Sequence, residues 1–144
     1  MRLQKAALTV AGVIGVGIIA IGARFLLQPG ESAAGFGMAP PPATDPYLAV
    51  KGVRDIGTAL VLLALLATRQ SRAVGWAMLA LSVIPLGDAL IVLANDGSPV
   101  AAYGIHGGTA AVALAAAGVL LLRDRATRGS ATAASGATVQ AATT

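Results

Sequence analysis

Four apolar stretches, each about 20 residues long, divide the chain. They are Ala6–Leu27, Leu48–Ala67, Ala73–Ala94 and Ala101–Leu122. Because an α-helix rises about 1.5 Å per residue, a stretch of this length crosses a hydrocarbon core roughly 30 Å thick. The pattern therefore predicts an all-α protein, a four-helix transmembrane bundle embedded in the lipid bilayer.

The composition leaves little room for anything else. Hydrophobic residues make up 56% of the chain and charged residues 11%, whereas a soluble domain has about 25% charged residues. We therefore predict one membrane domain over residues 1–128, with no second, soluble domain. Residues 129–144, rich in Ala, Thr, Ser and Gly, are predicted to form a disordered tail. The chain has no cysteine, which excludes a disulfide framework and a thiolate metal site.

Charge alternates between the connections that join these stretches. Positive-inside counting places both termini in the cytoplasm, in a multi-pass protein of the plasma (inner) membrane. An extracytoplasmic loop, residues 28–47, then joins helices 1 and 2, either as a lid over the bundle or as a plain connector. The net charge of +4 is spread over helix ends, so it indicates a membrane rather than nucleic acid. The basic residues on the predicted inner side are Arg2, Lys5, Arg69, Arg72, Arg123, Arg125 and Arg128.

The second stretch carries three charges within two turns, although each is costly in lipid. Lys51, Arg54, Asp55 and Thr58 are spaced i, i+3, i+4 and i+7, so they share one face of a helix. Because a charge that faces lipid is expensive, this face should point into the bundle.

Other ionisable residues fall at a similar depth. Asp88 follows Pro85, which should bend its helix, and His106 lies early in the fourth span. Both lie roughly 10–12 Å from the outer surface at the rise of a helix, and Arg24 lies near the outer end of the first. The charged groups Arg24, Lys51 and Arg54 against Asp55 and Asp88 sum to +1. We therefore predict a polar pocket in the outer half of the bundle.

Plainer interpretations stay open for each residue. Arg24 and Lys51 lie near helix ends and are able to reach the interface. Arg54 with Asp55 or Asp88 could form ion pairs that only hold the helices in register. His106 could be a hydrogen-bonded packing residue.

Four motifs resemble a known family. They are "ARFLLQP" at 23–29, "KGVRDI" at 51–56, "IPLGDA" at 84–89 and "YGIHGG" at 103–108. In content and order they resemble the family DUF4267 of small four-helix membrane proteins, over roughly Arg24 to Leu122. The overall shape is also similar, more loosely, to that of DoxX-type membrane proteins. The resemblance implies membership and a fold but no activity. The matching positions are Arg24, Pro29, Lys51, Gly52, Arg54, Asp55, Pro85, Asp88, His106 and Gly107.

Two classes of function follow from the pocket. In one, Arg24, Lys51 and Arg54 bind a lipophilic small molecule, anionic or carbonyl-bearing, without chemistry. In the other, the same pocket is the active site of an enzyme that needs no cofactor, with Asp55, Asp88 and His106 as acid–base groups for isomerisation, cyclisation or hydrolysis.

A structural or partner-binding role is a third alternative, and a homo-oligomer stays open. No nucleotide loop or zinc motif is present. We predict no metal site, because the neighbouring cations would repel one.

Overall fold

The computed structural model describes residues 2–39 and 46–142, all of whose regular elements are helices. Residues 40–45 of the predicted loop lie outside the described residues. Helix α3 agrees closely with the second predicted span, and the third span is divided into two helices. The elements are α1 (Arg2–Leu27), α2 (Pro29–Phe36), α3 (Tyr47–Ala67), α4 (Ser71–Leu81), α5 (Val83–Ala94), the π-helix η1 (Ala101–Gly107) and α6 (Gly108–Ala142).

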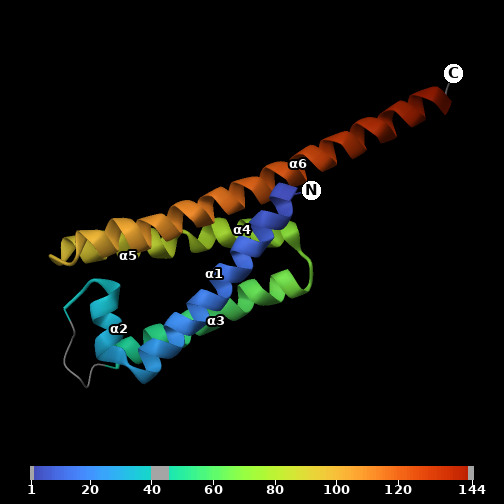
Figure 1. The fold of residues 1–144 in the computed structure, drawn as a ribbon. Helices are drawn as coiled ribbons and strands as arrows, with labels where there is room; N and C mark the ends of the chain where they lie inside the picture. The colour runs from blue at the N-terminus through green and yellow to red at the C-terminus, as the bar shows by residue number, and fades with distance from the viewer. Residues whose placement is uncertain (1, 40–45, 143–144) are drawn as a thin grey trace.

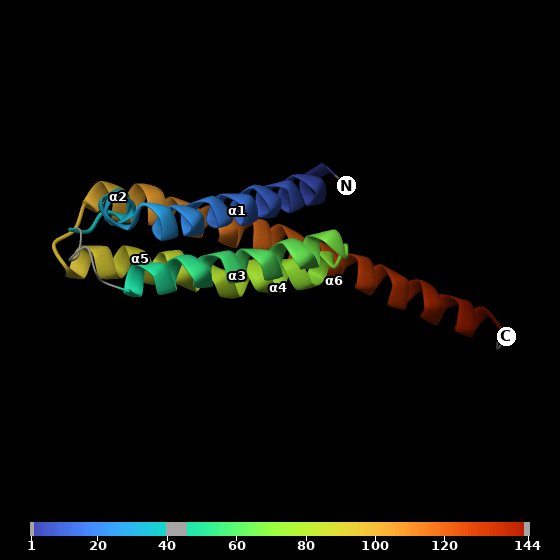
Figure 2. The same ribbon diagram turned by 90° about the horizontal axis from the view of Figure 1, so that it is seen from below.

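The long helices run along one another as two pairs. Helix α1 packs along α3, and the line of α4 and α5 packs along η1 and α6, as Figures 1 and 2 show. Helix α1 also contacts α6, which joins the pairs. The short α2 lies at one end of the bundle, near the start of α3 and η1 (Figure 1). We call this the α2 end.

Small residues bring α1 and α3 into backbone contact. A Cβ atom built on Gly52 would lie 2.7 Å from the backbone oxygen of Gly22, and the converse distance is also 2.7 Å. A core of alanines and four larger apolar side chains fills the bundle toward its other end. The buried residues there are Ala7, Ala11, Leu62, Val74, Met78, Ala113, Ala116, Ala117 and Leu120.

The break between α4 and α5 has a local cause. Ser82 separates the two helices, and its hydroxyl donates to the Leu79 carbonyl oxygen at 2.6 Å. Pro85 has no N–H for the carbonyl of Leu81, and its ring crowds that carbonyl. The bend expected from Pro85 therefore lies one turn before it.

Three helical segments are long and apolar enough to cross a membrane: Arg2–Leu27, Ser71–Ala94 and Ala101–Ala126. Helix α3 has 21 residues, but Lys51, Arg54 and Asp55 interrupt its apolar run. The chain thus has the helices of a membrane protein, and three helical segments have both the length and the apolar composition that a membrane span requires.

Helix α6 extends past the fourth predicted span. It continues through residues 129–142, the described part of the predicted tail, and projects from the bundle (Figure 2). Alanine has the highest intrinsic helix propensity, so an Ala-rich extension of an existing helix needs no tertiary contact to continue it. Residues 143–144 lie outside the described part.

Candidate functional site

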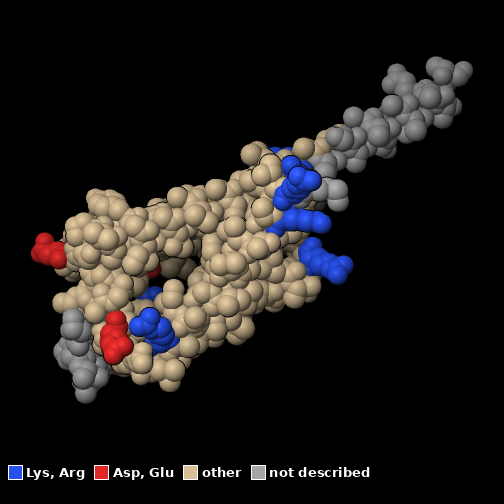
Figure 3. Space-filling view, in the orientation of Figure 1, with Lys and Arg blue, Asp and Glu red and all other residues tan. Residues whose placement is uncertain are grey.

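A cavity of about 260 Å³ lies within the bundle, toward the α2 end. The surface is hollowed there, and charged atoms are visible inside the hollow (Figure 3). A cavity of about 150 Å³ holds benzene, so this one has room for a larger organic group. The wall away from α2 is apolar. It is formed by Ile14, Ile18, Leu62, Met78, Leu81 and Ala113.

An ion pair on α3 forms one side of the polar end. Lys51 Nζ donates to Asp55 Oδ2 at 2.6 Å, and the side chains are 18% and 12% exposed. The same ammonium lies 4.8 Å from the ring centroid of Phe25 and 5.0 Å from that of Phe36. Lys51 is therefore held by a carboxylate and by two aromatic faces.

His106 joins η1 to α2 across the cavity. The residue is 6% exposed, and its Nε2 lies 2.9 Å from the Phe36 carbonyl oxygen. Because a carbonyl only accepts, Nε2 must carry a hydrogen, which leaves Nδ1 of the neutral ring as an acceptor. The ring also lies 4.3 Å from the Phe36 ring, centroid to centroid. The wider π-helical turn around His106 is of a type often found at functional sites.

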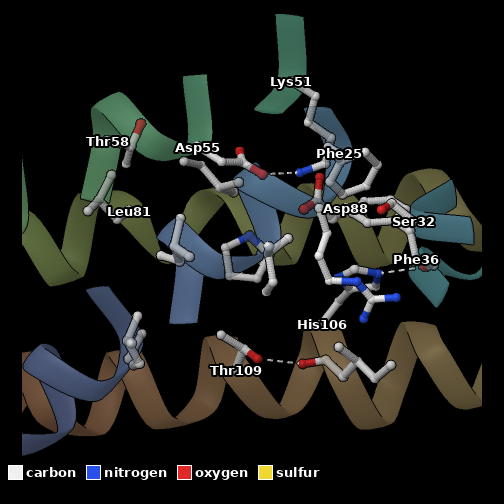
Figure 4. A pocket seen from close by; sticks show the side chains of 18 of the residues that line it. Phe25, Ser32, Phe36, Lys51, Asp55, Thr58, Leu81, Asp88, His106 and Thr109 are labelled. Atoms are coloured by element: carbon white, nitrogen blue, oxygen red, sulfur yellow. Dashed lines mark hydrogen bonds and ion pairs between the residues drawn. The ribbon is translucent and has the colours of Figure 1, made fainter. Parts of the chain in front are cut away.

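Asp88 faces the cavity from α5, and Figure 4 draws it at the same end of the cavity as Lys51 and Asp55. It is half-buried, and among the described residues it has no hydrogen bond or ion pair. Ser32 of α2 lines the same end and is 8% exposed, and its hydroxyl has no hydrogen-bond partner there. Two polar groups at the cavity's polar end thus lack a direct protein partner.

The structure brings five of the six predicted site residues to the cavity and leaves one out. Arg24, Lys51, Asp55, Asp88 and His106 line it, Arg24 being exposed. Arg54, which was expected to point inward, is exposed and is not among the residues that line the cavity. At about 100° per residue, Arg54 and Asp55 are the two edges of an arc about 100° wide, and only the Asp55 edge turns inward.

Glu31 of α2 replaces Arg54 in the lining, which reverses the charge. The lining holds two cations, Arg24 and Lys51, and three carboxylates, Glu31, Asp55 and Asp88, so its sum is −1 with His106 neutral. The sequence-based sum was +1. No three His, Asp or Glu side chains of the described residues lie close enough to hold a metal ion.

Sequence reasoning missed the residues of α2: Glu31, Ser32 and Phe36. The signal was present in "QPGESAAGFG", since Pro29 starts the helix, Glu31 lies in its first turn and Gly37 ends it with φ +100°. Proline, an early acid and a terminal glycine are ordinary helix boundary signals. Its position between two longer apolar runs favours a loop when the apolar pattern alone is considered.

Apolar helices around a cavity with a charged end define the class as small helical membrane proteins. Within that class the chain belongs to the family described as Domain of unknown function (DUF4267), whose model matches residues 15–121. That match confirms the resemblance drawn from the four motifs. No curated protein and no solved structure matches the chain, so the looser likeness to DoxX-type proteins has no support.

Proposed function

We propose that this protein is a four-span membrane protein whose cavity, in the outer half of the bundle, binds a lipophilic small molecule with a polar end. The observation that carries the proposal is the division of the cavity wall. Its deep part is aliphatic, while the α2 end presents charged and hydroxyl groups, among them Asp88 and the buried Ser32 hydroxyl, which have no hydrogen-bond partner among the described residues. An amphiphile matches both parts.

Helix α3 is proposed as the fourth span. Lys51 and Asp55 face the cavity and neutralise each other. The exposed face of α3 is otherwise apolar, with Val53, Leu60 and Val61 more than half exposed, as suits contact with lipid. Arg54 lies two turns from the start of α3, within reach of the interface for a long side chain.

The proposed orientation has both termini in the cytoplasm of a cell whose inner membrane holds the protein. On the face drawn in Figure 3 most basic side chains lie at the end where α1 begins, and acidic ones lie toward the α2 end. Arg72 of α4 pairs with Asp124 of α6 at that basic end, Nε to Oδ2 at 3.4 Å. The distribution supports positive-inside orientation with α2 on the outer side.

A bound compound is the test. We would purify the wild type in a mild detergent, record native mass spectra and seek a co-purified mass. Thr58 lines the cavity, so Thr58→Phe should fill it, whereas Val61→Phe on the exposed face of the same helix serves as the matched control. The expected result is one defined mass on the wild type and on Val61→Phe, lost from Thr58→Phe. If all three proteins carry the same adducts or none, the cavity is not a binding site.

The second candidate function is a membrane enzyme that needs no cofactor. Asp88 and His106 favour it, because both line the cavity from different elements and both are able to exchange protons. If the bound compound is a substrate, Asp88→Asn and His106→Gln should retain it but stop its conversion. Retained conversion in both variants would reject the enzyme.

The third alternative is a structural or partner-binding protein, with the charged residues as a lock between helices. It predicts that neither the wild type nor Thr58→Phe carries a compound. It also predicts that substitution of Lys51 lowers the stability of the protein and has no effect on ligand binding.

A further inference from the structure

We infer that the polar end of the bound amphiphile is a cation, a primary ammonium group seated against Asp88. This inference rests on the proposed binding function and specifies the ligand's chemistry. It departs from the sequence-based expectation of an anionic or carbonyl-bearing ligand. The change follows from three features of the cavity, namely its charge sum, the state of its buried cation and its unpartnered polar groups.

The charge sum is the first feature. Five charged side chains line the cavity with a total of −1, because Glu31 lies in the lining and Arg54 does not. Arg24 and Glu31 are both exposed and opposite in charge. The half-buried Lys51, Asp55 and Asp88 therefore have the same sum of −1. Partial removal from water strengthens the effect of that uncompensated charge. A cationic ligand would bring the total to zero, whereas an anion would bring it to −2.

The state of Lys51 is the second feature. An anionic ligand needs an available cation, but the Lys51 ammonium is bonded to Asp55 at 2.6 Å and lies over the rings of Phe25 and Phe36. Arg24, the other cation of the lining, is exposed. The cation near the buried polar end is therefore already neutralised by the protein.

The unpartnered groups are the third feature. Asp88 has no hydrogen bond or ion pair within the described part of the chain, and the buried hydroxyl of Ser32 also has none. Figure 4 shows both side chains at the same end of the cavity. An ammonium group offers three donors. A carboxylate and a hydroxyl oxygen are acceptors that such a group satisfies, the first through a charge-assisted bond.

The size of the apolar part of the cavity determines the length of the ligand's hydrocarbon chain. If about 150 Å³ holds the six carbons of benzene, then 260 Å³ holds about ten heavy atoms in proportion. A primary amine with a chain of about eight carbons suits this space. Such an ammonium occurs both on free alkylamines and on ethanolamine headgroups of lipids.

The test compares octylamine, octanol and octanoate, which share a chain and differ in head charge at pH 7. Equilibrium dialysis of the labelled compounds would use protein in nanodiscs of phosphatidylcholine, with empty nanodiscs subtracted. The expected result is that octylamine binds the wild type at least tenfold more tightly than octanol, and octanoate most weakly. Octanoate binding as tightly as octylamine, or octanol doing so, would overturn the inference.

Two variants sharpen the result. Asp88→Asn should weaken octylamine binding about tenfold and leave octanol binding within twofold. Arg54→Gln is the matched control, since it removes a charge from the exposed face of α3, and it should change none of the three affinities by more than twofold. If Asp88→Asn does not fold, the order of the three affinities for the wild type still tests the inference.

Failure of the two proposals is distinguishable. If octanol and octylamine bind equally and Thr58→Phe abolishes the binding of both, the cavity binds lipophilic molecules but the inference of a cationic head group is wrong. If no compound binds the wild type more than Thr58→Phe, the binding function itself is wrong. Lysophosphatidylethanolamine displacing octylamine, where its choline counterpart does not, would identify the headgroup as the ammonium source, and failure of both would identify a free amine.

Discussion

Gly52 is a position where the addition of one methyl group should have a clear effect. It lies in α3 against α1, and a Cβ there would lie 2.7 Å from the Gly22 backbone oxygen and 3.2 Å from the Phe25 Cβ. Ordinary contact begins at 3.4 Å, so the helices would have to separate by about 0.7 Å at this point. Because the nearest atom belongs to backbone, no rotamer change relieves the contact.

The magnitude comes from a comparison within one helix. Overpacking of this kind costs about 1–3 kcal/mol. Gly→Ala in a helix interior also gains about 0.5–1 kcal/mol through backbone entropy. Gly57 is exposed and has nothing within 4 Å of its added Cβ, so Gly57→Ala receives only the gain. The propensity term cancels between the two variants, and the difference between them should equal the overpacking cost.

The assay is unfolding in mixed micelles titrated with dodecyl sulfate, followed by circular dichroism. Gly57→Ala should be as stable as the wild type or slightly more so. Gly52→Ala should be less stable than Gly57→Ala by about 1–3 kcal/mol. Equal free energies of unfolding for the two variants would refute the close approach of α1 and α3.

Three further predictions concern the site and the topology. Lys51→Met leaves the Asp55 carboxylate partly buried without its cation, so the free energy of unfolding should fall by about 1–3 kcal/mol in the same titration. His106→Phe removes the donor to the Phe36 carbonyl, so amide exchange in α2 should become faster by mass spectrometry, and equal exchange would contradict that tie. A cysteine at Gln70, in a chain that has no other, should react with a membrane-impermeant reagent only from the inside if α3 spans the membrane.

Each of these three predictions has a control. Lys51→Met combined with Asp55→Leu should recover most of the lost stability, because no charge is left unpaired. Tyr103→Phe, on the exposed face of η1, should leave α2 exchange unchanged. A cysteine at Asn95 should react from the outside, and a Gln70 cysteine that reacts from the outside while the one at Asn95 reacts from the inside would reject α3 as a span.

Local features of the sequence were sufficient for most of the helices. The apolar run of 48–67 predicted α3 nearly to the residue. Pro85 predicted a bend, and the break lies at Ser82, as the missing N–H and the crowded carbonyl require. Depth along a helix follows from residue count alone, so the convergence of Asp55, Asp88 and His106 could also be predicted.

The tertiary structure decided which side chains actually meet. Phe36 lies 70 residues from His106 in sequence, and no local pattern indicates that its carbonyl would accept a hydrogen bond from that ring. Glu31 enters the cavity lining only because α2 folds back against the bundle. Such contacts depend on how the chain returns in space, which spacing does not encode.

The orientation of Arg54 is an example of a property that spacing alone does not determine. Spacing shows that it shares an arc of about 100° with Lys51 and Asp55. Which edge of that arc faces the interior depends on the rotation of α3 about its axis, and the backbone contact of Gly22 with Gly52 fixes that rotation. The sequence thus determined the helices, their apolar lengths and the depth of each charge, because these are local properties. Only packing determined the rotation of each helix, and with it the sign of the charge inside the cavity.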